Sequence, residues 1–444
     1  MKNVKLAKLW DSLHSSYWFV PTIMTAIAIA LAFTMLSLDR AGYYTLIEKW
    51  GWIYTGDANG ARSLLSAIGG SMITVAGTTF SITIVALQLA ASNFGPRLLR
   101  NFMQDTGNQI VLGTFIGTFI YCLLVLRTVH GDGDGYNEFV PQLSVTGGIV
   151  LALASIGLLI YFIHHASTII QASHIISEVS ADLDRATDQL FPKKIGRGLS
   201  ESKQPLRDIP ANFDEDACPI RSAGSGYVQA IDDEELMKIA CKHQLLLRLL
   251  SRPGKFIIQG SNLVMVWPGE RVNQKLSDRI NDAFILGKER TEQQDVEFPI
   301  AQLVEIAIRA ISPAVNDPFT AIRCIDRLSA GLSRLAQKDF PSPYRYDKDK
   351  NLRAIAEPVT FAGLTDTAFN QIRQYGKTDV AVTIRLLEAI EAIAGYTRNH
   401  NDRLTLLRHA ETIKRDSFEQ VSEELDRKDI EKRYQAVVKA IEQY

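Results

Sequence analysis

Four long stretches of this 444-residue chain contain no Asp, Glu, Lys or Arg. A helix that crosses the hydrocarbon core of a bilayer needs about 20 predominantly apolar residues. Buried helices of soluble proteins rarely run this far without a charge, so a large globular core is a poor explanation of the pattern. The charge-free stretches lie between Asp11 and Asp39, Arg62 and Arg97, Asp105 and Arg127, and Glu138 and Glu178. We therefore predict four membrane-spanning helices, over residues 17–38, 66–90, 108–128 and 143–166.

Basic residues around the predicted spans favour one orientation by a narrow margin. Cytoplasmic loops of membrane proteins carry an excess of Lys and Arg. The four cysteines show neither pairing nor CxxC spacing, which suits a reducing compartment. We therefore predict that both termini lie in the cytoplasm. The side of the N-terminus carries Lys2, Lys5, Lys8, Arg97 and Arg100, and the opposite side carries Arg40, Lys49, Arg62 and Arg127.

The remaining composition restricts the function classes. The formal net charge is −1, so the chain offers no concentrated basic surface for nucleic acid. No nucleotide-binding loop, metal-ligand cluster or catalytic triad stands out in the sequence. We predict no cofactor, no metal site and no nucleic acid partner, and we do not expect an enzyme.

The second predicted span carries polar residues along one face. Ser, Thr and Gln recur there at a spacing of three and four residues, interrupted only by Val85, and fall within an arc of about 100° on a helical wheel. At about 1.5 Å per residue they extend for about 30 Å, enough to cross the hydrocarbon core. This polar stripe consists of Ser71, Thr74, Thr78, Ser81, Gln88 and Ser92.

Two interpretations of the polar stripe remain open. Small and hydroxylated residues let membrane helices pack closely and form hydrogen bonds with each other. A face of hydroxyls with one amide is also suited to line a water-filled pore or cavity. A homo-oligomer whose subunits meet along this face would satisfy both interpretations.

The other predicted spans offer packing surfaces and few ionisable groups. Gly113 and Gly117 form a GxxxG pattern in the third span, which predicts a close helix–helix contact. No carboxylate, Lys or Arg lies well inside any span, and this disfavours proton- or sodium-coupled transport. His164 and His165 lie near the end of the fourth span, where simple solvation and proton sensing are the alternatives.

The chain beyond the membrane is predicted to contain both strands and helices. The helical spacing of the fourth span continues to Leu190 without a breaker, which predicts one helix over about residues 142–190. Short apolar runs between Gly and Pro turn signals predict strands from residue 218, helices dominate from 297, and residues 339–352 read as an exposed loop. The predicted fold is an α-helical membrane protein with four transmembrane helices and a C-terminal cytoplasmic α+β domain. Its parts are a cytoplasmic N-terminus (1–16), a four-helix transmembrane domain (17–171), a helical extension and linker (172–217), a small β-rich subdomain (218–293) and a helical subdomain (294–444).

A turn between two of the predicted helices contains Asn316, Asp317 and Pro318. Asp is a favourable N-cap residue, and Pro suits the first position of a helix. We interpret these residues as a capping corner, with a ligand or subunit-contact site as the alternative.

Three long segments occur in order along the chain: TTFSITIVALQLAASNFGPRLLRNFMQD, LGTFIGTFIYCLLVLRTV and EIAIRAISPAVNDPFTAIRCIDRL. Together they resemble a bacterial predicted-membrane-protein family, domain of unknown function 2254. The resemblance covers nearly the whole chain and implies a multi-pass protein of the bacterial inner membrane. It implies no activity, substrate or catalytic residue.

Two functions from different classes fit these patterns. The first is a homo-oligomeric ion or small-solute channel, in which the polar stripe lines the path and the cytoplasmic domain gates it. The second is a non-conducting membrane-anchored sensor or scaffold, whose stripe only packs and whose soluble domain binds a partner. Both place the chain in membrane lipid, and neither identifies the cytoplasmic ligand or protein partner.

Overall fold

The computed structural model describes residues 17–41, 53–95, 105–131, 138–169, 171–191 and 209–443. The chain divides after His174 into two compact units, which we call the membrane unit (Lys5–His174) and the C-terminal unit (Ile175–Tyr444). The predicted N-terminal segment 1–16 and the linker residues 192–208 lie outside the described residues.

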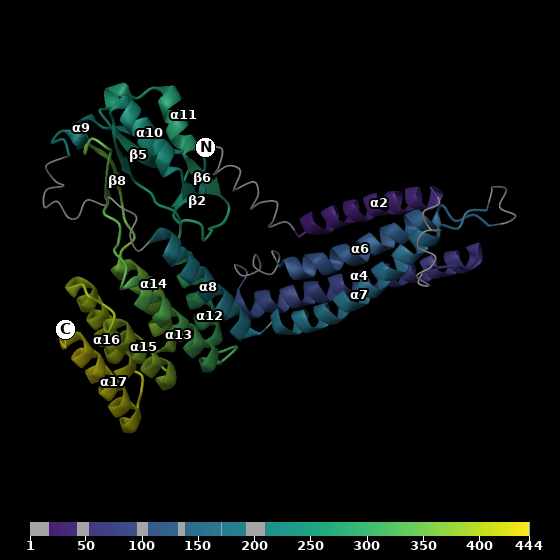
Figure 1. The fold of residues 1–444 in the computed structure, drawn as a ribbon. Coiled ribbons are helices and arrows are strands. Elements are labelled where there is room, and N and C mark those ends of the chain that lie inside the picture. Colours follow the sequence, from purple (N-terminus) through teal and green to yellow (C-terminus); the bar gives the residue numbers. More distant parts are fainter. Residues whose placement is uncertain are drawn as a thin grey trace. The chain divides into compact units, whose positions relative to one another are not determined.

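The described residues of the membrane unit form four helices that are long and apolar enough to cross a bilayer, which confirms the four predicted spans. They run side by side in Figure 1. The longest of them begins earlier than predicted because Asp57 caps it, accepting a hydrogen bond from the N–H of Gly60 at 2.9 Å. The helices are α2 (Phe19–Arg40), α4 (Ala58–Phe94), α6 (Thr106–Leu126) and α7 (Gln142–Ile169).

Helix α6 is the most buried of the four because it packs against α2, α4 and α7. Phe115 and Val125 on this helix are 0% exposed. The buried hydroxyl of Tyr121 donates to the carbonyl of Ser144 in α7 at 2.9 Å, so this polar group is satisfied inside the bundle. Helix α6 is therefore the centre of the membrane unit.

The two glycines of the GxxxG pattern in α6 face α2. A Cβ atom at Gly113 would lie 2.7 Å from Sδ of Met24 and 3.1 Å from Cα of Pro21. A Cβ atom at Gly117 would lie 3.3 Å from Cβ of Ala28. The absence of side chains at both positions allows the two helix backbones to approach each other closely.

The expectation of one continuous helix over residues 142–190 is wrong. Helix α7 ends at Ile169, and α8 (Ala172–Leu190) begins after Gln171, which belongs to no helix. The N–H of Gln171 bonds to the carbonyl of Thr168, three residues back, so the α-helical pattern is lost. The hydroxyl of Thr168 bonds to the carbonyl one turn earlier at 2.9 Å, an arrangement that weakens and bends helices.

The C-terminal unit contains two sheets that share one apolar core with α10 (Asp233–His243) and α11 (Gln274–Asp282). The five-stranded sheet has the order β1-β5-β3-β8-β7, and the three-stranded sheet has the order β4-β2-β6. Ile239 of α10 and Ile280 of α11 are 0% exposed in this core. The strands are β1 (Cys218–Arg221), β2 (Gly226–Ile231), β3 (Leu246–Leu249), β4 (Phe256–Ile257), β5 (Asn262–Trp267), β6 (Phe284–Gly287), β7 (Tyr344–Tyr346) and β8 (Leu352–Ala356).

Strands β7 and β8 lie in a region that the sequence pattern assigned to a loop and a helical subdomain. Strand β7 falls inside the expected loop 339–352, and β8 pairs in parallel with β3, with Ala354 opposite Leu247. The expected loop therefore contains a strand, and the subdomain expected to be helical contributes two strands to a sheet. A parallel strand pairs with a partner far away in the chain, so it leaves no local hairpin signal.

Six further helices form three hairpins that stack in two layers, with α12, α14 and α16 in one layer and α13, α15 and α17 in the other (Figure 1). Asp366 of α14 pairs with Arg408 of α16, and Arg373 pairs with Asp416, so helices within a layer run parallel. The three hairpin turns therefore lie along one edge, which we call the turn edge. This is the architecture of a helical repeat protein. The helices are α12 (Glu297–Ala310), α13 (Pro318–Leu335), α14 (Phe361–Gly376), α15 (Val380–Ala394), α16 (His400–Phe418) and α17 (Glu424–Glu442).

We expect Gly113→Leu to destabilise the membrane unit by about 1–3 kcal/mol, because the new side chain has no room against α2. Thermal unfolding of the purified protein in detergent would measure the loss. Gly157→Leu is the matched control, since a Cβ atom at Gly157 meets nothing within 4 Å. An equal loss in both variants would contradict the proposed role of the α2–α6 contact.

Candidate functional site

Helix α4 presents two different faces, and its inner face packs against α6 and α7. Thr79 and Thr83 lie on this inner face with 2% and 6% of their surface exposed. The hydroxyl of Thr83 donates to the carbonyl of Thr79 at 2.9 Å, so it is satisfied without a partner from another helix. The inner face thus belongs to the core of the bundle. Its buried apolar residues are Ala61, Leu65, Met72, Ala76, Ala86 and Ala90.

The polar stripe lies on the other face of α4, which is exposed. Gly70 and Gly77 border the stripe, and a Cβ atom at either position would meet nothing within 4 Å. Within the part of the chain that the structure describes, no helix covers this face. Packing among the described residues therefore does not account for the stripe. All six of its residues are exposed: Ser71, Thr74, Thr78, Ser81, Gln88 and Ser92.

Most hydroxyls of the polar stripe are satisfied by their own helix. Those of Ser71, Thr74, Thr78 and Ser81 donate to carbonyls one turn earlier at 2.7–3.1 Å. The oxygen of each hydroxyl still offers lone pairs as an acceptor. The stripe can therefore contact water, ions or another helix without leaving a donor unsatisfied.

Gln88 differs from the hydroxyls of the polar stripe. Its primary amide has two donor hydrogens and one acceptor oxygen. Among the described residues, no hydrogen bond of this amide is found. An amide left without partners in an apolar environment costs several kcal/mol, so Gln88 needs water or a polar group beyond the described residues as its partner.

A buried carboxylate holds the first turn of α7. Asp39 at the end of α2 is 5% exposed and accepts hydrogen bonds from the N–H groups of Leu143 and Ser144 at 2.9 Å each. The hydroxyl of Ser144 donates to the same carboxylate at 2.6 Å. These contacts satisfy N–H groups that the start of a helix leaves without intrahelical partners. Asp39 therefore joins α2 to α7.

A second carboxylate lies at the other end of α7. Asp105 caps α6 by accepting from the N–H of Gly107 at 2.9 Å, and it also contacts Nε2 of His165 at 2.6 Å. The ring of Tyr161 stacks on the ring of His165, with centroids 5.2 Å apart. His165 therefore has a defined interhelical contact, whereas the neighbouring His164 is exposed.

The roles of these two carboxylates were not recognised in the sequence. Asp105 stands directly before a charge-free stretch, so a capping signal was present there. Asp39 offered no such signal, because its nearest bonded partner is 104 residues away in the chain. Contacts of that kind become visible only when the helices are placed side by side.

The structure places Asn316, Asp317 and Pro318 at the start of α13. The carboxylate of Asp317 accepts hydrogen bonds from the N–H and the hydroxyl of Thr320 at 3.1 and 2.6 Å. Pro318 opens the helix, and Asn316 adopts a left-handed conformation with φ of 51°. This geometry is that of a helix cap. In the described ranges, no group of three or more His, Cys, Asp or Glu residues is arranged to hold a metal ion.

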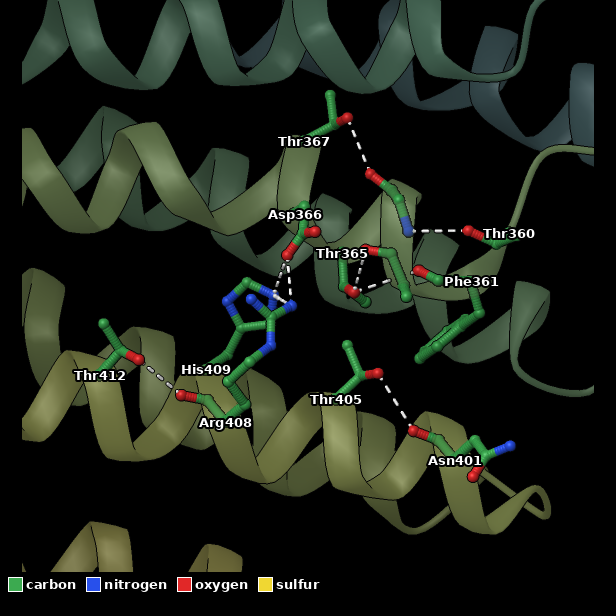
Figure 2. Close-up of polar contacts among 12 residues, drawn as sticks. Thr360, Phe361, Thr365, Asp366, Thr367, Asn401, Thr405, Arg408, His409 and Thr412 are labelled. Carbon is green, nitrogen blue, oxygen red and sulfur yellow. Dashed lines mark hydrogen bonds and ion pairs between the residues drawn. The ribbon is translucent and has the colours of Figure 1, made fainter.

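A buried histidine lies between α14 and α16 in the C-terminal unit (Figure 2). His409 is 2% exposed, and its Nε2 lies 3.0 Å from Oδ1 of Asp366, which also pairs with Arg408. The ring meets the ring of Phe369 edge to face. Burial, followed by the charge of Arg408, lowers the pKa of His409 to about 4, although Asp366 acts in the opposite direction. His409 is therefore neutral in the folded protein near pH 7.

Comparisons with known proteins identify relatives. A family model described as predicted membrane protein, DUF2254, matches residues 14–392. Uncharacterized proteins of Mycobacterium tuberculosis and Mycobacterium bovis are each 33% identical over 425 residues, covering 94% of this chain and 79% of the relative. No solved structure matches the chain.

The lowered pKa of His409 predicts that the C-terminal unit loses stability in mild acid. Its pKa falls from an ordinary value of 6.5 to about 4, so between these values the unfolded chain binds a proton that the folded chain does not. The contribution of His409 to stability is therefore complete above about pH 6.5 and declines toward about pH 4, by up to about 3 kcal/mol. Urea unfolding of the full-length protein at a series of pH values would measure it.

The comparison of two variants isolates this effect from the carboxyl groups that titrate in the same range. His409→Gln should remove the His409 part of the pH dependence. His400→Gln, at the exposed start of α16, should leave the pH dependence of the parent unchanged. Parallel curves for the parent and His409→Gln would contradict the assignment.

Proposed function

We propose that this chain, which belongs to the DUF2254 family of predicted membrane proteins, assembles in the bilayer as a homo-oligomer around the polar stripe of α4. The observation that carries the proposal is the exposure of all six stripe residues on a helix whose other face is already buried. Lipid tails offer no hydrogen bonds, whereas a second copy of the stripe offers hydroxyls and amides. Small residues such as Gly77 also let a neighbouring helix approach closely.

The same assembly provides a path for an ion or small solute. Stripes from several subunits around a common axis would surround it with hydroxyl oxygens and one ring of Gln88 amides. We place the assembly in the bacterial inner membrane with both termini in the cytoplasm, in accord with the positive-inside rule. The C-terminal unit then acts as the gate. The proposal assigns no catalytic chemistry to the chain.

A non-conducting sensor or scaffold is the second candidate. It is favoured by the hydroxyls of Thr74, Thr78 and Ser81, which bond to their own helix and so need no water. In this case the polar stripe forms a helix–helix interface between subunits that contains no water. The stacked hairpins of the C-terminal unit then bind a partner, as helical repeats commonly do.

Assembly through the stripe predicts a specific disulfide cross-link between subunits. In a chain with Cys218 and Cys241 replaced by Ser, Thr78→Cys should form cross-linked dimers under mild oxidation in membranes. Thr34→Cys is the matched control, because Thr34 is an exposed hydroxyl on α2 with the same bond to a carbonyl one turn earlier. Denaturing gel electrophoresis without reductant would show the products. Equal cross-linking at both positions would argue against a stripe-specific interface.

Conduction predicts solute flux through liposomes that contain the purified protein. Thr78→Leu should lower the flux about fivefold or more, since the loss of one ring of hydroxyls removes about 1 kcal/mol of stabilisation per bonded solute. Gln88→Leu should act in the same direction, and Thr34→Leu should conduct like the parent. Intact cross-linking at residue 78 without any flux in the parent would instead favour the scaffold.

A further inference from the structure

Helix α8 runs parallel to α13 within the C-terminal unit. The guanidinium of Arg327 contacts the hydroxyl of Ser177 at 3.4 Å, and the ammonium of Lys338 contacts Asp188 at 3.1 Å; both pairs are 150 residues apart. Between them, Gly331 lies so close to Leu183 that no Cβ atom would fit. This constant separation places the first turn of α8 beside residues 322–325, so the first turn of α13 extends past the start of α8.

Chain connectivity ties the start of α8 to the bilayer. Helix α7 is long and apolar enough to span a membrane as far as Thr168, and α8 starts at Ala172. Four residues reach at most about 14 Å, so α8 starts near the surface of the bilayer. Helices packed side by side are about 10 Å apart. The first turn of α13 can therefore reach the headgroup region.

The loop before α13 and its first turn carry exposed apolar side chains. Phe319 is 75% exposed, the highest value among the large apolar side chains that the structure describes, and Val315 is 49% exposed. The cap formed by Asp317 fixes this turn. Arg323, one helical turn beyond Phe319, is exposed as well. An aromatic ring next to an arginine is the combination that anchors proteins at the boundary between headgroups and acyl chains.

We propose that Val315 and Phe319 form a membrane anchor that inserts into the headgroup region of the leaflet facing the C-terminal unit. Arg323 then contacts lipid phosphates. The occupant is lipid because the anchor is tied to the surface of the bilayer through α8. The third hairpin does not share this role, since its turn carries the acidic residues Glu419, Glu423 and Glu424 and would be repelled by anionic headgroups. The membrane anchor does not depend on whether the proposed homo-oligomer conducts an ion or solute.

Depth measurement with spin labels tests the anchor in the full-length protein in phospholipid vesicles. Cys218 and Cys241 are replaced by Ser, and a nitroxide is attached at Phe319→Cys. The matched site is Leu404→Cys, which is 48% exposed at the start of α16, on the edge opposite the turn edge. We expect the label at 319 to collide often with dissolved oxygen and rarely with a water-soluble nickel chelate, and the label at 404 to show the reverse.

Two results would overturn the anchor. A label at 319 that collides with the nickel chelate as often as the label at 404 would place it in water. A label at 319 that is shielded from both oxygen and nickel would place it under protein, either a partner or a second copy. Val315→Cys provides an independent label in the same turn and should report the same environment as the label at 319.

Discussion

Hydrocarbon offers no hydrogen-bond partners, and this constraint organises the whole membrane unit. Helices satisfy their own backbone groups except at their ends, and carboxylates accept from N–H groups in the first turns of α4, α6 and α7. Asp57 and Asp105 cap their own helices, whereas Asp39 caps α7 from the end of α2. The hydroxyls of Thr78 and Ser81 follow the same rule when they bond to carbonyls of α4. These bonds satisfy polar groups within the bundle, so they do not oppose the apolar packing of the helices.

Patterns in the sequence predicted the spans and the polar stripe, because long charge-free stretches have few alternatives to spanning helices. A helical wheel, however, fixes a side chain only relative to its own axis. The neighbours α6 and α7 decide that Thr79 points inward and Thr78 outward, so only the structure could show that the stripe is exposed. Strand β8 and the role of Asp39 escaped prediction for a related reason: their partners are distant in the chain.

The repeated hairpins of the C-terminal unit were also not predicted from the sequence. Strands β7 and β8 are inserted between the first and second hairpins, and this insertion conceals a regular period. In a stack of repeats each unit contacts only its neighbours. The third hairpin packs against the second, through ion pairs such as Arg373–Asp416 and through His409. Protonation of His409 would therefore destabilise the third hairpin first.

The polar stripe needs different partners at different positions along α4. Gln88 lies six residues before the end of α4, about 9 Å along the axis, so water at the membrane surface can reach its amide. The middle of the stripe has no such access. There Gly77 lies in open space between hydroxyls that bond to their own helix, and a small residue at this position lets a neighbouring helix approach closely. An arrangement of several copies of α4 around a common axis would satisfy both requirements. The middle of the stripe would contact a neighbouring helix, and Gln88 would contact water.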